Sequence, residues 1–141
     1  MPLRMDAGDV ARAVFAAIDR HDVDELVSYM SDDVVFDFPL ERGSEGHHVG
    51  KDDVADWFRT FLAEAPVIDF AHRRVLVERP AATDGPNMAH VAWDLRLVND
   101  AGVTRWYHGV TQLELMGGTI VRMRDFIFEQ VRLAVPAPVG A

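Results

Sequence analysis

The sequence predicts a single α+β domain in which helices come first and an antiparallel sheet ends the chain. Apolar residues recur at helical spacing in the first half, and four alternating segments follow at 67–79, 88–98, 103–116 and 119–130. No repeat and no change in composition divides the 141 residues, a length that suits one core. The element order is therefore ααβαββββ, and such a sheet can curl around the longest helix and leave a cavity at the open end of a cone.

Three helices are expected before residue 67. The first covers 7–19, and the second follows a capping pattern formed by Asp22 and Glu25. The third, in "KDDVADWFRTFLAEAP", carries the strongest signal and stops at Pro66. Its apolar residues fall at i, i+3, i+4, i+7 and i+8 and are Val54, Trp57, Phe58, Phe61 and Leu62.

The remaining segments are short strands, turns and a tail. "VVFDFPL" predicts a strand that Pro39 closes, and the glycine-rich "ERGSEGHHVG" predicts a loop. "NDAG" is typical of a hairpin turn between two of the later strands. We expect one domain over residues 1–132 and a flexible, proline-rich tail over 133–141.

Charge and composition narrow the possible partners. The formal net charge of −9 comes from 23 acidic and 14 basic residues, so nucleic acid and anionic membrane surfaces are disfavoured partners. The absence of cysteine excludes disulfides, thiolate nucleophiles and cysteine-bound metals. The first residues lack a signal-peptide core and no segment is long and apolar enough to span a membrane, so a cytoplasmic protein is expected.

Strand-borne carboxylates are the most informative candidates for chemistry. Asp37, Asp94 and Asp125 each lie within a predicted strand, where aspartate is depleted. Asp125 shares a face with the apolar residues at 121, 123 and 127, so it lies where a carboxylate needs a partner or a function. If the three face one cavity, they can supply a general acid, a general base and a group that positions water.

Structural explanations compete with this hypothesis. Asp94 has a possible ion-pair partner in Arg96, two residues further along the same face. Trp57 and the other aromatic residues can be either core or the wall of a hydrophobic pocket. The histidines lack acidic residues at ligand spacing, and no metal site is predicted.

The opposite face of the last strand has a different character. It carries Arg122, Arg124, Phe126 and Phe128, a mixture of arginine and aromatic residues that fits a protein interface. We expect the chain to form a homodimer.

Two long segments carry a resemblance to a known superfamily. The stretches "VVFDFPLERGSEGHHVGKDDVADWF" and "YHGVTQLELMGGTIVRMRDFIFE", within the helix and strand order above, resemble the nuclear transport factor 2-like superfamily. The likeness runs from about residue 8 to residue 132 and is greatest to SnoaL-like polyketide cyclases and the limonene-epoxide hydrolase group. It implies a cystatin-like cone with a curved, mixed or antiparallel sheet, no cofactor, and pairing through the outer sheet face.

The resemblance also implies roles for individual residues. "MRDFIF" is similar to the segment that holds the second catalytic aspartate of the epoxide hydrolases, and this places that role on Asp125. "AWD" is similar to the triplet that ends in their first aspartate, which places that role on Asp94. The bridging arginine then falls on Ala92, the asparagine on Asp37 and the tyrosine on Val35.

These departures favour one reaction class over another. Without the bridging arginine, a cofactor-independent cyclase or isomerase that acts on a small hydrophobic, oxygenated molecule ranks above an epoxide hydrolase. A non-catalytic ligand-binding or dimerisation module remains an alternative. Asp125, Asp94 and Asp37 are the candidate catalytic residues, and the candidate substrate-binding residues are Arg96, Tyr107, Arg105, Trp57, Met123, Ile127 and Val35.

Overall fold

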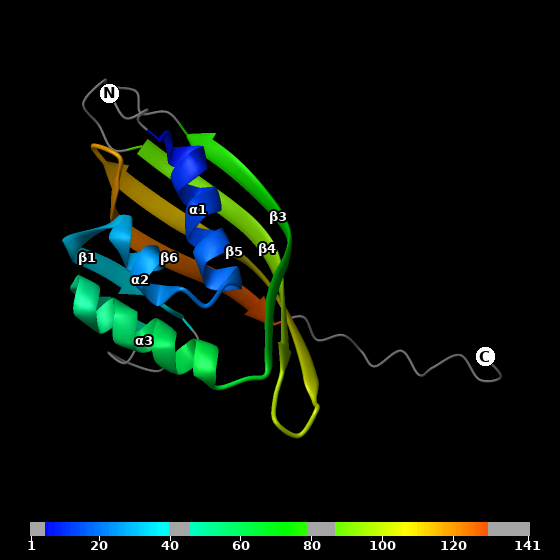
Figure 1. Ribbon diagram of the computed structural model, residues 1–141. Coiled ribbons are helices and arrows are strands. Elements are labelled where there is room, and N and C mark those ends of the chain that lie inside the picture. Colours follow the sequence, from blue (N-terminus) through cyan, green and yellow to red (C-terminus); the bar gives the residue numbers. More distant parts are fainter. Residues whose placement is uncertain (1–4, 40–45, 79–86, 130–141) are drawn as a thin grey trace.

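One layer of helices covers one face of a curved sheet (Figure 1). The computed structural model describes residues 5–39, 46–78 and 87–129. The helices are α1 (Ala7–Asp19), α2 (Val23–Ser28) and α3 (Lys51–Ala63). The strands are β1 (Met30–Asp37), β2 (His47–Val49), β3 (Val67–Glu78), β4 (Asn87–Val98), β5 (Thr104–Met116) and β6 (Thr119–Glu129).

The six strands form one sheet in the order β2-β1-β6-β5-β4-β3. β1 runs parallel to β6, and every other neighbouring pair is antiparallel. Strands β3 to β6 form a meander, and the last strand returns to pair with the first (Figure 1). The predicted α+β class and mixed, curved sheet are confirmed.

The observed order adds one element to the predicted one. The three-residue strand β2 lies within the segment expected to be a loop, and it pairs with β1 through Val35–Val49 and Asp37–His47. So short a strand depends on its neighbour for its hydrogen bonds, and local composition does not reveal it. The expected proline-rich tail at 133–141 lies outside the described residues.

Capping side chains determine where two helices begin. Asp6 and Asp9 form a reciprocal capping box at the start of α1, and the Asp22 side chain accepts from the backbone N–H of Glu25 at the start of α2. Gly50 precedes α3 with φ of 94°, a conformation that favours glycine. α3 ends at Ala63, three residues before the proline expected to stop it.

The core lies between the helices and the inner face of the sheet. α1 packs on β3 and β4, while α3 packs on β1. Alternation along β4 places one row inward, which is almost fully buried and comprises Ala89, Val91, Trp93 and Leu95. None of the helices in the described ranges is long and apolar enough to span a membrane.

The outer face of β6 is partly apolar. Phe126 and Phe128 are 46% and 65% exposed there, in the row that also holds Arg122 and Arg124. This is the placement that alternation predicts. The homodimer expected from it stays a prediction.

Gly109 leaves room for the largest buried ring, the indole of Trp93. It is the cross-strand neighbour of Trp93, and a Cβ built on Gly109 would lie 2.4 Å from Cη2 of that indole and 2.7 Å from the carbonyl oxygen of Phe126. Contacts so short force the ring or the backbone to move. A side chain at residue 109 is therefore incompatible with the observed position of the indole.

We expect Gly109→Ala to lower the free energy of unfolding by about 1–3 kcal/mol, the usual cost of overpacking a core. Chemical denaturation of Gly109→Ala, Trp93→Leu and the double variant measures it. Since a smaller residue at 93 removes the clash with the indole but not the contact with the Phe126 carbonyl oxygen, the double variant should recover part of the loss and be more stable than the sum of the two single effects. Strict additivity would contradict the clash with the indole as a cause of the lost stability.

Candidate functional site

Asp125 is the only one of the three candidate aspartates that faces the helices. It follows Met123 and precedes Ile127 in the inner row of β6, and its cross-strand neighbour on β5 is Thr111. Strand alternation alone sets this direction, because Phe126 and Arg124 on either side point outward. The sequence prediction that Asp125 looks toward the interior agrees with this placement.

A short hydrogen-bonded chain holds the Asp125 carboxyl group. Trp93 Nε1 donates to Thr111 Oγ1 at 2.9 Å, and Thr111 Oγ1 donates to Asp125 Oδ1 at 2.6 Å. The indole N–H can only donate, so the single hydroxyl proton of Thr111 is directed to the carboxyl group. Among the described residues no other hydrogen bond to Asp125 is found, which leaves Oδ2 available to a ligand.

Aromatic rings enclose this carboxyl group. It lines a cavity of about 10 Å³ together with Phe38, Trp57, Phe58, Phe61, Phe70, Trp93, Leu95 and Ile127. Such a volume holds about one water molecule. The rings pack closely, as shown by Phe38 and Trp57, whose centroids are 4.5 Å apart.

The apolar surroundings alter the acidity of Asp125. Burial raises its pKa from 3.8 to about 7, while the hydrogen bond from Thr111 acts in the opposite direction and offsets only part of this. Within the described part of the chain no cation forms an ion pair with it. Near neutral pH this carboxyl group can therefore both give and accept a proton.

Asp94 lies on the other face of the sheet, which corrects the expectation that it partners Asp125. Its oxygens bind His72 Nδ1 at 3.0 Å and His108 Nδ1 at 2.9 Å. Hydrogen bonds from His108 and His72 hold the pKa of Asp94 below its usual value. Because Trp93 points inward, its neighbour must point outward, and the expected pair of carboxylates does not form. The two histidines, rather than Arg96, are its partners.

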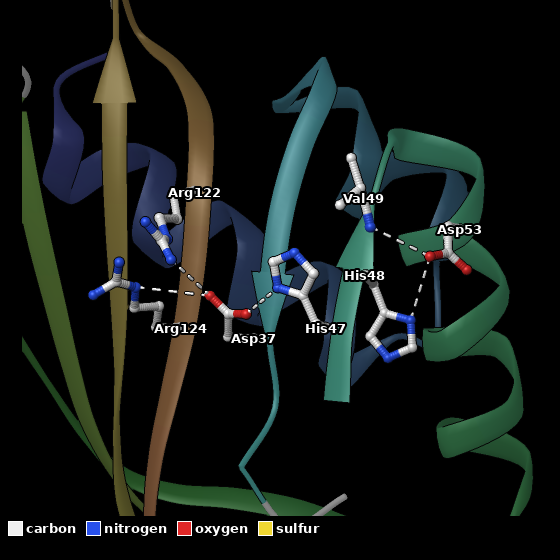
Figure 2. A network of polar contacts seen from close by, with 7 residues as sticks. All are labelled: Asp37, His47, His48, Val49, Asp53, Arg122 and Arg124. Carbon is white, nitrogen blue, oxygen red and sulfur yellow. Dashed lines mark hydrogen bonds and ion pairs between the residues drawn. The ribbon is translucent and has the colours of Figure 1, made fainter. Parts of the chain in front are cut away.

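Asp37 also lies on the outer face. Its oxygens bind His47 Nδ1 at 2.5 Å and Arg122 at 3.1 Å, and Arg124 Nε lies 3.8 Å away. Figure 2 shows the carboxylate between the imidazole on one side and the two guanidinium groups on the other. Burial alone would raise the pKa of Asp37, but the hydrogen bonds from His47 and Arg122 outweigh it and the pKa is lowered. The three aspartates therefore do not converge on one cavity, although Asp37 and Asp125 both line an open crevice at the end of β1.

A family model decides the relationship of the chain to known proteins. The model described as a SnoaL-like domain matches residues 11–123. The chain belongs to the SnoaL-like domain family. No curated protein shows significant sequence similarity to it.

Solved structures resemble the SnoaL-like domain over most of its length. A protein with a cystatin-like fold from Xanthomonas campestris is 24% identical, with a TM-score of 0.71 over 89% of this chain and 93% of that one. A provisionally named polyketide cyclase from Pseudomonas putida is 18% identical, with a TM-score of 0.68 over 86% and 91%. TerC, co-crystallised with polyporic acid, is 18% identical, with a TM-score of 0.69 over 85% and 89%. At these identities the likeness establishes the fold.

The other predicted site residues of the SnoaL-like domain divide into three groups. Trp57 and Ile127 line the cavity beside Asp125, as expected. Tyr107 and Met123 are buried in the core. Three more do not line the cavity: Arg96 and Val35 are partly buried in the outward rows of β4 and β1, and Arg105 is exposed near the β4–β5 hairpin.

The sequence did not reveal Thr111, and it indicated Phe38 only as one of several aromatic residues that could be core or pocket wall. Thr111 is 1% exposed, the one buried polar residue in the described part of the chain, and its role depends on the pairing of β5 with both β4 and β6. Phe38 immediately precedes Pro39, the proline that the sequence predicts to close a strand. The available signal for Phe38 was an aromatic residue in the strand row that faces inward. Thr111 could be identified only once the register of the strands was known.

We expect the stability of the SnoaL-like domain to fall between pH 5 and pH 7 because of Asp125. The pKa of this carboxyl group is raised to about 7 in the folded state, so it ionises at lower pH in the unfolded chain. As the pH rises above 3.8, this ionisation stabilises the unfolded state relative to the folded state. Relative to Asp125→Asn, the wild type should lose about 2–3 kcal/mol of unfolding free energy across this window. Urea denaturation at a series of pH values measures the difference.

The control is Asp52→Asn, which replaces an exposed carboxylate in the first turn of α3. A plot of its unfolding free energy against pH should be parallel to that of the wild type. A wild-type profile parallel to that of Asp125→Asn would show that Asp125 titrates normally.

Proposed function

We propose that this SnoaL-like domain is a cofactor-independent acid/base enzyme of the cyclase or isomerase type, with Asp125 as its proton carrier. The observation that carries the proposal is a single carboxyl group with a pKa of about 7 inside a cavity walled by aromatic rings. General acid/base catalysis is most efficient when the pKa lies near the operating pH. The apolar walls fit a small hydrophobic substrate that carries carbonyl groups.

The reaction begins with ionised Asp125. Its free oxygen, Oδ2, removes a proton from a carbon next to a carbonyl group, and the C–H electron pair becomes the enolate. In a cyclase this enolate carbon attacks a second carbonyl group of the same molecule, and the new alkoxide takes the proton back from Asp125. In an isomerase the proton returns to a different carbon, and in both cases the carboxylate is regenerated.

Thr111 and Trp93 act as positioning residues in this scheme. Thr111 holds Oδ1 and so fixes which oxygen faces the substrate. Trp93 occupies one lone pair of the Thr111 hydroxyl and prevents that hydroxyl from turning away. The family membership and the polyketide cyclase among the similar folds support the reaction class.

The geometry favours this reaction over epoxide hydrolysis. Asp94 and Asp125 lie on opposite faces of the sheet, so they cannot share one water molecule. A non-catalytic binding module is favoured by one different observation, which is that aromatic rings fill the interior and leave about 10 Å³. In that alternative Asp125 would serve as a hydrogen-bonding group for a ligand.

The direct test is hydrogen–deuterium exchange next to a carbonyl group. A panel of small cyclic and aromatic 1,3-dicarbonyl compounds and β-keto esters is incubated in D₂O, and enzyme-dependent deuterium incorporation is followed by NMR. Asp125→Asn should reduce the exchange rate by at least about 100-fold, the usual contribution of a general base. Asp94→Asn is the matched control, because its carboxylate lies on the other face, and it should exchange at the wild-type rate. Equal exchange by wild type and Asp125→Asn would refute the assignment.

Thr111→Val should shift the pH dependence of exchange upward. The Thr111 hydroxyl lowers the pKa of Asp125, so its loss raises that pKa further and delays formation of the carboxylate. A hydrogen bond to a charged group is worth roughly 1.5–3 kcal/mol, which corresponds to a displacement of about one pH unit or more. A uniformly lower rate with an unchanged pH midpoint would instead show that Thr111 serves only the packing.

A further inference from the structure

A second hollow opens where β1 ends and β6 continues. This crevice has a volume of about 310 Å³, which lies at the lower end of the range for small-molecule sites. Its walls are mainly apolar but include both signs of charge, and the lining residues are Asp37, Phe38, Pro39, Gly46, His47, Arg124, Asp125 and Phe126.

The crevice adjoins the cavity beside Asp125. Phe38 and Asp125 line both spaces. The Phe38 ring is buried and packs against Trp57 with centroids 4.5 Å apart, so it forms part of the wall between them. A molecule held in the crevice therefore lies next to the proton carrier of the proposed reaction.

Two guanidinium groups lie beside the Asp37 carboxylate next to this opening, and the wall of the crevice also contains the carboxyl group of Asp125. One carboxylate, Asp37, is surrounded by two guanidinium groups and an imidazole, those of Arg122, Arg124 and His47 (Figure 2). The chain as a whole carries a net charge of −9, so two neighbouring arginine side chains are a departure from its average surface. Such a group attracts an anion and does so more strongly when apolar walls reduce the contact with water.

Arg124 is the cation with the most capacity for a new partner. Its Nε lies 3.8 Å from Asp37, whereas Arg122 is at 3.1 Å and His47 at 2.5 Å. The contact that the structure records for Arg124 leaves both terminal nitrogens available, and its side chain is 37% exposed. Asp37 can therefore keep His47 and Arg122 while Arg124 binds a second carboxylate in the two-pronged geometry that guanidinium groups favour.

We propose that this crevice binds the acidic group of the substrate. The substrate is accordingly an apolar carboxylic acid or an apolar enol of similar acidity. Arg124 binds the anionic oxygens, and the apolar part of the molecule lies against Phe38 and Phe126. The inference rests on the proposed function for its catalytic meaning, since Asp125 then acts on the bound acid. The binding itself can be measured without turnover.

The test compares two probes of nearly equal shape, 2-naphthoate and the neutral 2-naphthamide, by NMR titration of the ¹⁵N-labelled protein. We expect the wild type to bind the acid at least about tenfold more tightly than the amide, as one charge-assisted hydrogen bond suffices for this. Arg124→Gln should remove the preference, and Arg124→Lys should keep part of it because the charge remains. Arg59→Gln, which removes an exposed cation of α3 that pairs with Asp24, is the control and should bind as the wild type does.

The possible outcomes separate the two proposals. Equal affinity for acid and amide, or an acid affinity unchanged in Arg124→Gln, would overturn the crevice assignment and leave the deuterium-exchange result untouched. The wild type could instead bind naphthoate in an Arg124-dependent manner and catalyse no deuterium exchange in any compound of the panel. That result would support the assignment of the crevice and refute the proposal of an acid/base enzyme. The ¹⁵N spectra of each variant show directly that it is folded.

Discussion

The hydrogen bonds from Trp93 to Thr111 and from Thr111 to Asp125 link three adjacent strands at one point of the inner face. Their geometry requires the register of both β4–β5 and β5–β6, because a shift of one residue would turn Thr111 or Asp125 to the outer face. It also requires a glycine at residue 109, since any side chain there would displace the indole. The position of the carboxyl group is thus a property of the whole sheet.

A single interior carboxyl group is tolerable because it can be neutral. Burial raises the pKa of Asp125 from 3.8 to about 7, so the neutral form is favoured below neutral pH. The outer face follows the opposite rule, because Asp94 and Asp37 each have at least two cationic or imidazole partners and are stabilised in their charged form. The sheet therefore separates one carboxyl group suited to proton transfer from two that are held ionised.

The sequence predicted the direction of Asp125 correctly and that of Asp94 wrongly, and the reason is visible in β4. Strand alternation divides residues into two rows but does not say which row faces the core. For β6 the apolar neighbours of Asp125 indicated its row. For β4 the row of Val91, Trp93 and Leu95 gave the same kind of signal against Asp94, but the likeness of "AWD" to an epoxide hydrolase motif favoured the other choice. Thr111 depends on the register of two successive hairpins, and the crevice depends on the pairing of β1 with β6, which are far apart in sequence; no local pattern contains either.

The small volume of the inner cavity bears on how a substrate would reach Asp125. About 10 Å³ admits no organic molecule, so the bound state requires an aromatic ring to move aside. Phe38 lies one residue beyond the end of β1 and separates the cavity from the open crevice; its backbone N–H donates to the carbonyl oxygen of Gly46 at 2.7 Å, so the movement in question is that of its side chain. Beyond Asp37 the ladder with β6 ends, whereas Trp93 and Leu95 are held within a continuous β4–β5 ladder. Displacement of Phe38 would join the two spaces and bring an acid held by Arg124 next to Oδ2 of Asp125. Binding of the acidic group and access to the proton carrier would then be a single event, in which the affinity for the substrate offsets the cost of opening the aromatic wall.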